Sequence, residues 1–479
     1  MRRLLIILLA GASTAACTLE PRYVRPDAPI PTQWPVGGPY PTNAPAAEAG
    51  AANPVILDAR LQRLIATGLD NNRDLRVALA NIAASRAQYR IQRAALLPEL
   101  AASGRYTASR RSLANGQTGA GANVDRNSES YAAEIGINAF EVDLFGRVRS
   151  LARADLNRYL ASEAGARATR LTLVGDIAEA WLNHAADQSL LKIAEETAAN
   201  AERGVSLTSA RLRGGVAPRT DLRQAETILA TARADVARLR SVVAQDVNAL
   251  QLLVGGPVDA GLLASSIDDA ASAVALPAAG LSSTVLLNRP DVIEAEYGLR
   301  AANAEIGAAR AALFPRISIT GAGGFASDAL SSLFTDRAFT SSISPGVTWS
   351  FFRAGAGLAG VDAARARQEA AVATYERAIQ AAFRETADAL ARNGTIADQG
   401  AAVRLRLDAA ADSYRLADAR YRGGVDAFLS SLDAQRTFYS AQQAQVAIQL
   451  ETAVNRIDLY RALGGGDPLD IGPLPEAQR

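Results

Sequence analysis

The sequence predicts a mixed α/β membrane protein in which very long α-helices are combined with four amphipathic β-strands per chain. Three observations predict this fold class. No proline lies between Pro98 and Pro218 or between Pro345 and Pro468, so both stretches can hold helices much longer than those of a globular core. The chain contains a long internal duplication. Segments beside the helical stretches alternate apolar and polar residues, which is typical of strands with one apolar face.

The amino terminus has the features of an export signal. A basic start is followed by an apolar run and then by small residues that end at Cys17, the only cysteine among 479 residues. We expect residues 1–16 to be a signal peptide, because the apolar run is too short to span a bilayer. Thr14-Ala15-Ala16-Cys17 resembles a bacterial lipobox, whose cysteine becomes the lipidated first residue, although Thr14 stands where that pattern prefers leucine. A plain secretory leader beside an unmodified cysteine is the alternative.

Residues 17–56 are expected to form a proline-rich arm that carries the lipid. Nine prolines make this segment unsuitable for a helix or a central strand. Thr18 follows the cysteine, whereas by resemblance to sorted lipoproteins an aspartate there would retain the protein at the inner membrane. We therefore expect an outer-membrane location with a covalent lipid on Cys17.

The duplication divides the remaining chain into two structural repeats. Leu96-Leu97-Pro98 recurs 217 residues later as Leu313-Phe314-Pro315. Arg211-Leu212-Arg213-Gly214-Gly215-Val216 recurs 209 residues later as Arg420-Tyr421-Arg422-Gly423-Gly424-Val425. A period of this length indicates one structural half that occurs twice rather than a solenoid unit. We assign the first repeat to residues 57–256, a connecting segment to 257–289, the second repeat to 290–465 and a C-terminal tail to 466–479.

Each repeat is expected to contain a short helix, two strands, a long helix, a tight turn and a return helix. At about 1.5 Å per residue, the long helix reaches on the order of 100 Å, which a globule cannot bury. The helices must therefore form a coiled-coil assembly or a helical tube. The first repeat has helices at 73–96, 147–213 and 217–254 and strands at 98–108 and 131–145; the second has helices at 290–313, 357–422 and 425–463 and strands at 315–325 and 342–353.

The predicted strands have one apolar face and one polar face. Ile317 and Ile319 alternate with Arg316 and Ser318, for example. In a soluble sheet this would be a core face and a solvent face, whereas in an exported protein it also fits a barrel with lipid outside and water inside. In the strand at 131–145 the apolar phase changes after Ala139, which suggests either a β-bulge or an exit of the chain from the membrane.

Four strands are too few to close a barrel, because about eight are needed to enclose a filled interior. Two chains would give a filled barrel of eight strands, and three would give twelve strands with room for water. A channel therefore favours a homotrimer.

Composition disfavours several classes of function. One Cys, one His and one Met exclude a disulfide framework and make a Cys/His metal site or a catalytic dyad very hard to build. The formal net charge of +1 gives no basis for nucleic-acid binding through a global field. The lone His184 is assigned an ordinary packing or surface role in a predicted helix. We expect no enzymatic activity, no metal and no cofactor other than the lipid on Cys17.

These features together resemble the TolC-like outer-membrane factor family, in particular its OprM-like, NodT-type lipoprotein branch. The resemblance covers nearly all of the mature chain. The motifs that carry it are Leu276-Pro277-Ala278-Ala279-Gly280-Leu281, Leu287-Asn288-Arg289-Pro290-Asp291-Val292, Asp143-Leu144-Phe145-Gly146-Arg147, the turn at 420–425 and Leu432-Asp433-Ala434-Gln435.

The resemblance implies a homotrimer with a twelve-stranded outer-membrane β-barrel, four strands per chain, continuous with a long periplasmic α-helical barrel. The termini and residues 257–289 would form an equatorial belt. The implied function is the outer-membrane exit duct of a tripartite efflux pump of the resistance-nodulation-division (RND) type, which passively conducts drugs, solvents or metal ions. Its implied partners are a periplasmic adaptor, an inner-membrane RND transporter and outer-membrane lipid.

Two alternatives remain open. The first is the outer-membrane duct of a type I protein-secretion system, which shares the fold. The second is a periplasmic coiled-coil scaffold without a pore, which explains the helices but leaves the paired amphipathic strands unexplained.

The resemblance also assigns residues to a periplasmic tip. The turns at Gly214-Gly215 and Gly423-Gly424 would contact the adaptor, and glycine suits a reversal between antiparallel helices that needs a positive φ. Asp433 matches an aspartate that lines the family's tip aperture, where threefold symmetry would produce a ring of carboxylates. A solvated helix residue near a turn is the alternative for Asp433.

Asp221 and Tyr421 match a pair that links neighbouring helices by a hydrogen bond in TolC. The sequence departs from TolC at Ser430, where TolC has another aperture aspartate, and at Asp426, where it has arginine. An apolar constriction at Phe428 and Leu429 is the alternative to that closing network.

Overall fold

The computed structural model describes residues 18–40, 55–110, 127–277 and 282–465. The expected signal peptide, Cys17 and the C-terminal tail lie outside these residues. The chain divides into two compact units. The sheet unit comprises the described residues within 1–26, 83–161 and 295–374, and the turn unit comprises the described residues within 27–82, 162–294 and 375–479.

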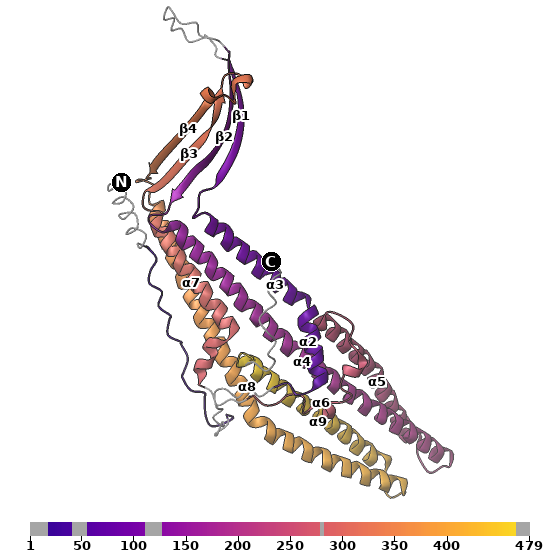
Figure 1. Ribbon diagram of the computed structural model, residues 1–479. Helices are drawn as coiled ribbons and strands as arrows, with labels where there is room; N and C mark the ends of the chain where they lie inside the picture. Colours follow the sequence, from indigo (N-terminus) through magenta and orange to yellow (C-terminus); the bar gives the residue numbers. More distant parts are fainter. Residues whose placement is uncertain (1–17, 41–54, 111–126, 278–281, 466–479) are drawn as a thin grey trace, which may run out of the picture. The chain divides into compact units, whose positions relative to one another are not determined.

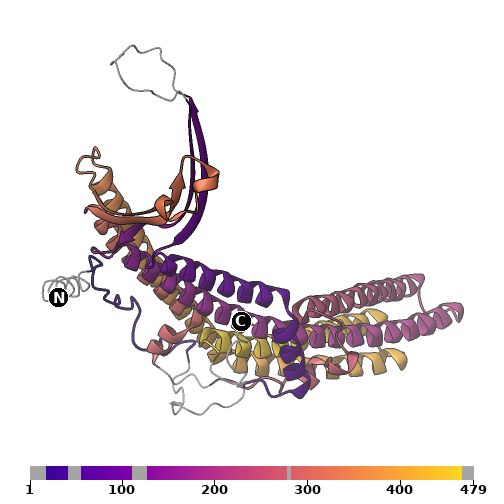
Figure 2. The same ribbon diagram turned by 45° about the horizontal axis from the view of Figure 1, so that its top comes forward.

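The sheet unit contains an antiparallel sheet with the strand order β1-β2-β3-β4, which curves along its strands (Figure 2). Its apolar face is not covered by the described chain, since Ile343 is 80% exposed and Val347 is 69% exposed. Burial of such a face requires lipid or another chain. The strands are β1 (Leu100–Arg110), β2 (Asn127–Val142), β3 (Arg316–Ser327) and β4 (Phe339–Thr348), with the short helices η3 (Leu330–Ser332) and η4 (Asp336–Ala338) between β3 and β4.

The bulge that the apolar pattern predicts is present in β2. The register between β2 and β3 shifts between Ile137 and Phe140, and Ala139 has a φ of 49°. The extra residue keeps the apolar side chains on one face. Before the bulge Ile135 and Ile137 pair with Gly323 and Gly321, and after it Phe140 and Val142 pair with Ile319 and Ile317.

The predicted bounds of the last strand, 342–353, are wrong at both ends, because β4 covers Phe339–Thr348. The aromatic residues after Thr348 continue the alternation, but the chain has already left the sheet. The indole Nε1 of Trp349 donates a hydrogen bond to Leu313 O at 3.1 Å, and Ala354 has a φ of 47° just before the next helix. The strands expected at 98–108, 131–145 and 315–325 are found at the bounds of β1, β2 and β3, displaced by a few residues.

The helices of the two halves have matched lengths (Figure 1). Each lies within about one helical turn of the range expected from the sequence. Within the described residues, no helix has a stretch long and apolar enough to cross a membrane. The pairs are α3 (Arg73–Ala94) and α7 (Pro290–Ala311) with 22 residues each, α4 (Arg147–Arg213) and α8 (Ala356–Arg422) with 67 each, and α5 (Arg219–Val254) and α9 (Phe428–Ala462) with 36 and 35.

The helix α2 (Ala59–Asn71) was not among the elements expected from the sequence. Asp58 caps this helix, because its side chain accepts hydrogen bonds from the backbone N–H groups of Arg60 and Leu61. Leu61, Leu64 and Ile65 are buried on one face. The cap and the three-to-four spacing of these residues were the available signal for a helix.

The largest core lies in the turn unit. Trp181 and Ile177 of α4 belong to one buried cluster with Ile65 of α2 and Leu250 of α5. Trp181 Nε1 donates a hydrogen bond to Leu262 O at 2.9 Å, which ties the connecting segment to this core. That segment forms the short helices η1 (Ala260–Leu262), α6 (Ile267–Ala270) and η2 (Ser283–Asn288).

The described part of the arm is held by specific contacts in each unit. In the turn unit Trp34 stacks on Phe383, with 5.2 Å between ring centroids. In the sheet unit Arg25 pairs with the buried Glu296 at 2.7 Å. The described part of the arm is thus fixed by side chains, although residues 18–40 contain no helix and no strand longer than an isolated bridge.

Candidate functional site

The candidate functional site lies in the turn unit at the two helix turns, one joining α4 to α5 and the other joining α8 to α9 (Figure 1). Both turns have the hydrogen bonds of a Schellman motif. In the first, Val216 N donates to Arg211 O at 3.0 Å and Gly215 N donates to Leu212 O at 3.0 Å. In the second, the equivalent bonds run from Val425 N to Arg420 O at 2.9 Å and from Gly424 N to Tyr421 O at 3.0 Å.

Only the second glycine of each turn needs the conformational freedom of glycine. Gly215 and Gly424 have φ values of 72° and 76°, a region that costs an ordinary residue about 1–2 kcal/mol. Gly214 and Gly423 have no positive φ, and a Cβ atom added at either would meet no atom closer than 3.4 Å. The expected need for a positive φ therefore applies to one glycine of each pair.

Tyr421 connects the two turns. The guanidinium of Arg211 lies over its ring, with Cζ 4.7 Å from the centroid, and Arg211 Nη1 donates to Tyr421 O at 3.0 Å. The Tyr421 hydroxyl lies 3.3 Å from the hydroxyl of the buried Thr208. The end of α4 is thus joined to the end of α8 by a cation–π contact and two hydrogen bonds.

Asp221 lies in the first turn of α5, half-buried, and its backbone N–H donates to Pro218 O at 3.2 Å. Within the described chain no hydrogen bond joins its side chain to Tyr421, whose hydroxyl is next to Thr208 instead. The hydrogen bond between Asp221 and Tyr421 that the family pattern implies is therefore not formed inside one chain in this conformation.

Arg420 and Asp426 bridge the second turn. Arg420 Nε and Nη2 donate to the two carboxylate oxygens of Asp426 at 2.6 and 2.8 Å. These hydrogen bonds hold the pKa of the Asp426 carboxyl below its usual value. The equivalent position in the first turn is Ala217, so the first turn has no such pair.

Phe428 and Leu429 are adjacent but have different environments. Phe428 is 7% exposed, lies 5.2 Å from the Tyr421 ring and shares a buried cluster with Ala225 of α5. Leu429 is 61% exposed. Of the two residues expected to form an apolar constriction, only Leu429 presents its side chain to the surface in this conformation.

Asp433 follows Leu429 by four residues and lies on the same face of α9. Both side chains are exposed, and Arg436, three residues further, is exposed as well. Asp433 has no ion pair within the described residues, and its backbone oxygen accepts a hydrogen bond from Thr437 Oγ1 at 3.0 Å. We call Leu429, Asp433 and Arg436 the exposed stripe of α9.

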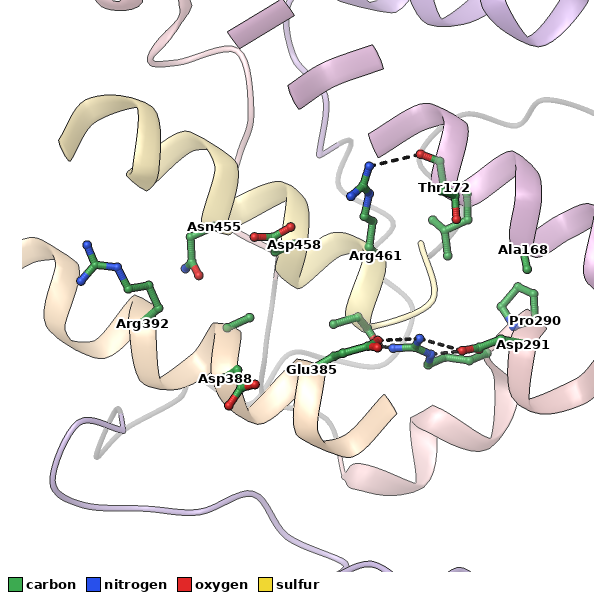
Figure 3. A pocket seen from close by; sticks show the side chains of 14 residues that line it. Ala168, Thr172, Pro290, Asp291, Glu385, Asp388, Arg392, Asn455, Asp458 and Arg461 are labelled. Carbon is green, nitrogen blue, oxygen red and sulfur yellow. Dashed lines mark hydrogen bonds and ion pairs between the residues drawn. The ribbon is translucent and has the colours of Figure 1, made fainter. Parts of the chain in front are cut away.

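A polar cavity of about 600 Å³ lies elsewhere in the turn unit, between α4, α7, α8 and α9 (Figure 3). The buried Arg289 forms part of its wall. Its guanidinium donates to Asp291 at 2.8 and 3.0 Å, to Glu385 at 2.9 Å and to Ala462 O at 2.8 Å. The Asn-Arg-Pro-Asp motif therefore fastens the start of α7 to α8 and to the end of α9.

Neither the turns nor the cavity bring together a metal-binding group. In the part of the chain that the structure describes, no three His, Cys, Asp or Glu side chains are placed to hold a metal ion. His184 is buried within α4, and burial lowers the pKa of its imidazole. Its surroundings are those of a packed core residue.

The residues that hold Tyr421 and Arg289 in place were not expected from the sequence. Arg211 was seen only as part of the repeated turn, although it reaches a residue 210 positions away. The pairing of Arg420 with Asp426 had a signal, because opposite charges flank one turn six residues apart. Nothing in the sequence pairs Arg289 with Glu385 or with the end of α9.

The chain is similar to known proteins over nearly its whole length. The family model described as outer membrane efflux protein matches residues 64–256 and 281–465. A toluene efflux pump outer membrane protein of Pseudomonas putida, TtgC, is 42% identical over 469 residues, which cover 97% of this chain and 96% of that protein. The antibiotic efflux pump outer membrane protein ArpC of Pseudomonas putida has the same identity and coverage.

Solved structures agree with this assignment. The crystal structure of the open state of the MtrE outer membrane channel of Neisseria gonorrhoeae is 34% identical, has a TM-score of 0.82 and covers 94% of this chain and 98% of that chain. The family expected from the motifs is therefore confirmed by sequence and by structure. The chain belongs to the outer membrane efflux protein family, whose members are TolC-like transport channels of the outer membrane.

Proposed function

We propose that the chain is the outer-membrane exit duct of a tripartite RND-type efflux pump, assembled as a homotrimer and anchored by a lipid on Cys17. The observation that carries the proposal is the similarity, over 97% of the chain, to outer membrane proteins of efflux pumps. The partners would be a periplasmic adaptor and an inner-membrane RND transporter. The duct itself is a passive conduit and not an enzyme.

The open edges of the sheet support a trimer. β1 and β4 are its outer strands, and each pairs with one neighbour among the described strands. Inside a membrane the free edges must be hydrogen-bonded, and four strands are too few to close a barrel. Three copies joined from β4 to β1 would form a twelve-stranded barrel, with exposed side chains such as Ile343 and Val347 facing lipid.

The two turns support contact with the adaptor. Val216 and Val425 follow the left-handed glycines at equivalent positions and are 73% and 66% exposed. Exposed apolar side chains on rigid turns are suited to docking another protein. We assign Gly214, Gly215, Gly423 and Gly424 to this contact because they shape the turns that present both valines.

The exposed stripe of α9 is the evidence for an aperture in the assembled channel. In a threefold assembly Asp433 would contribute three carboxylates and Leu429 three apolar side chains on the same helix face. The contacts of Tyr421 with Thr208 and Arg211 would hold the turn that precedes this part of α9. Asp221 would contact Tyr421 only after a conformational change or from a neighbouring chain.

Relatives are named for toluene efflux and for antibiotic efflux. We therefore expect apolar solvents and antibiotics to be exported through this channel, with selection made by the inner-membrane transporter.

The test is expression of the chain with its pump and adaptor in a Gram-negative strain that lacks its own efflux channel. Resistance to toluene and antibiotics should rise only when all three components are present. Secretion of a protein without any gain in resistance would contradict the efflux assignment and favour a type I secretion duct.

Two measurements test the assembly and the anchor separately. Native mass spectrometry of the detergent-purified protein should show three chains, and a monodisperse monomer or dimer would overturn the twelve-strand arrangement.

Mass spectrometry of the mature amino-terminal peptide should show a lipid on Cys17. An unmodified Cys17, or a mature start several residues downstream, would remove the lipoprotein assignment and leave the channel assignment standing.

A further inference from the structure

An open groove of about 420 Å³ lies in the sheet unit, where the end of α3 meets the start of α4. Its volume is within the range of small-molecule sites. Its apolar lining includes Tyr89, Leu96, Ala152 and Leu156. We call it the anchor groove. Leu96 precedes β1 by four residues, and α4 begins five residues after β2, so the groove lies at the junction of helices and strands.

Three arginines, Arg93, Arg149 and Arg153, also line the anchor groove. Arg149 pairs with Asp143 at 3.2 Å. Arg153 is engaged by the chain itself, since it pairs with Glu20 at 3.0 Å. Arg93 has no hydrogen bond or ion pair within the described residues, although it lines the groove and is exposed. A guanidinium offers five N–H donors, so Arg93 is free to bind an oxygen-rich group beside the apolar lining.

The start of the described chain is fastened at this groove. Thr18 itself lines it, and Arg153 Nη2 donates to Thr18 Oγ1 at 2.9 Å. Arg310 of α7 donates to Leu19 O at 3.2 Å. Gly307 admits the backbone of Glu20, because a Cβ atom at Gly307 would lie 2.9 Å from Glu20 Cα. Three consecutive residues are thus held against α4 and α7.

We propose that the anchor groove holds the glyceryl group and the first methylenes of the lipid on Cys17. The inference rests on the lipidation proposed above and adds the site that receives the lipid. Consecutive Cα atoms are about 3.8 Å apart, so the lipid begins within one residue of a groove that Thr18 lines.

The chemistry of the groove matches this occupant in two parts. The apolar lining residues suit methylenes, and Arg93 can donate hydrogen bonds to the ester oxygens, which are acceptors only. The acyl chains would then continue into the bilayer beside the exposed apolar face of the sheet. The groove would fix where the anchor enters the membrane, whereas a free tether would leave that position undefined.

The test uses the full-length protein in cells fed a palmitate analogue with a diazirine near its carboxyl end. After irradiation and purification of the protein, mass spectrometry maps the peptides joined to the lipid. We expect the cross-links in the peptides that contain Tyr89 to Leu96 and Ala152 to Leu156. In Leu96→Gln the yield should fall about fivefold, the scale expected when one apolar contact is replaced by a polar group.

Matched variants separate the groove from its surroundings. Leu97→Gln changes the neighbouring leucine, which is 73% exposed and does not line the groove, and should leave the yield unchanged. Arg93→Gln should lower the yield, whereas Arg86→Gln, at an exposed arginine of α3 outside the groove, should not. Native mass spectrometry of each variant checks that assembly is intact.

Two results would overturn the inference, and they can be told apart. A lipidated amino-terminal peptide with cross-links equal in Leu96→Gln and Leu97→Gln would reject the groove and retain the lipid anchor. An amino-terminal peptide without lipid would reject the anchor and the groove together. Cys17→Ser is the control that should abolish all labelling of that peptide.

Discussion

At the scale of single residues, a pair of carboxyl groups makes the stability of the folded protein depend on pH. Asp187 of α4 faces Asp246 of α5 in the turn unit. Burial and the neighbouring Asp187 carboxylate raise the pKa of Asp246 to about 6, and burial raises the pKa of Asp187 as well. His184 and Arg238 are the other groups that act on the pair electrostatically. Ionisation of both carboxyl groups therefore places two negative charges against each other in a half-buried site.

The sign of this effect predicts a stabilising variant. The pKa of Asp246 is higher in the folded protein than in the unfolded chain. The protonated carboxyl group of Asp246 therefore contributes stability that is complete below pH 4 and is lost as the pH rises through about 6. Asp246→Asn should therefore stabilise the protein at pH 7.5, by about 1 kcal/mol after solvent screening, and should give no gain at pH 4. Thermal unfolding at both pH values measures the difference.

Asp408→Asn is the matched control, because Asp408 is exposed on α8 and makes no hydrogen bond or ion pair within the described chain. It should show no such pH-dependent gain. An equal stabilisation by Asp246→Asn at pH 4 and at pH 7.5 would rule out charge repulsion as the cause.

At the scale of elements, the two helix turns are the same structure made twice. The Schellman bonds and the left-handed glycine recur at positions 209 residues apart. Their surroundings have diverged, since Arg420 bridges its own turn to Asp426 while its equivalent Arg211 reaches across to Tyr421. Arg211 of the first turn therefore stabilises the second turn, and the pair of Arg420 and Asp426 stabilises the second turn from within.

The turn geometry predicts unequal effects for adjacent glycines. Gly215→Ala should destabilise the first turn by about 1 kcal/mol, because alanine is strained at positive φ. Gly214→Ala should be close to neutral, since its φ is not positive and its Cβ would have space. Hydrogen exchange of residues 208–220 measures the opening of the turn, which should be about fivefold more frequent in Gly215→Ala. Equal exchange in the two variants would contradict the role of φ.

At the scale of the whole molecule, three chains would bring three copies of the exposed stripe of α9 to one aperture. Neighbouring carboxylates resist simultaneous ionisation and attract multivalent cations. The wild-type channel in planar bilayers should have low conductance that divalent cations reduce further from the periplasmic side. Asp433→Ala should weaken this block, and Asp408→Ala should not.

A different variant tests the support behind the aperture. Tyr421→Phe removes the hydroxyl that lies 3.3 Å from Thr208 and should raise conductance without changing the cation block. Asp221→Ala should have the same effect only if Asp221 reaches Tyr421 in the closed assembly. If Asp433→Ala leaves conductance and block unchanged in an intact trimer, Asp433 is a solvated helix residue and Leu429 becomes the candidate constriction.

Most of the long helices and strands could be predicted from the sequence alone, because their causes are local or periodic. The absence of proline and the spacing of apolar residues predicted α4 and α8, and the duplication predicted both turns. The apolar phase change after Ala139 predicted the bulge in β2. The end of β4 was misjudged because Trp349 and Phe351 keep the alternation after the strand has left the sheet.

Which residues of the candidate site act together depends on the packing of the helices against one another. Phe428 and Leu429 are indistinguishable as a pair of apolar residues, yet neighbours on a helix point in directions about 100° apart, so packing buries one against Tyr421 and exposes the other. Arg211, Thr208 and Tyr421 meet because α4 and α8 end side by side, although 213 positions separate Thr208 from Tyr421. Sequence periodicity fixes which face of a helix is apolar, whereas the partner of that face depends on contacts between helices that are distant in the chain.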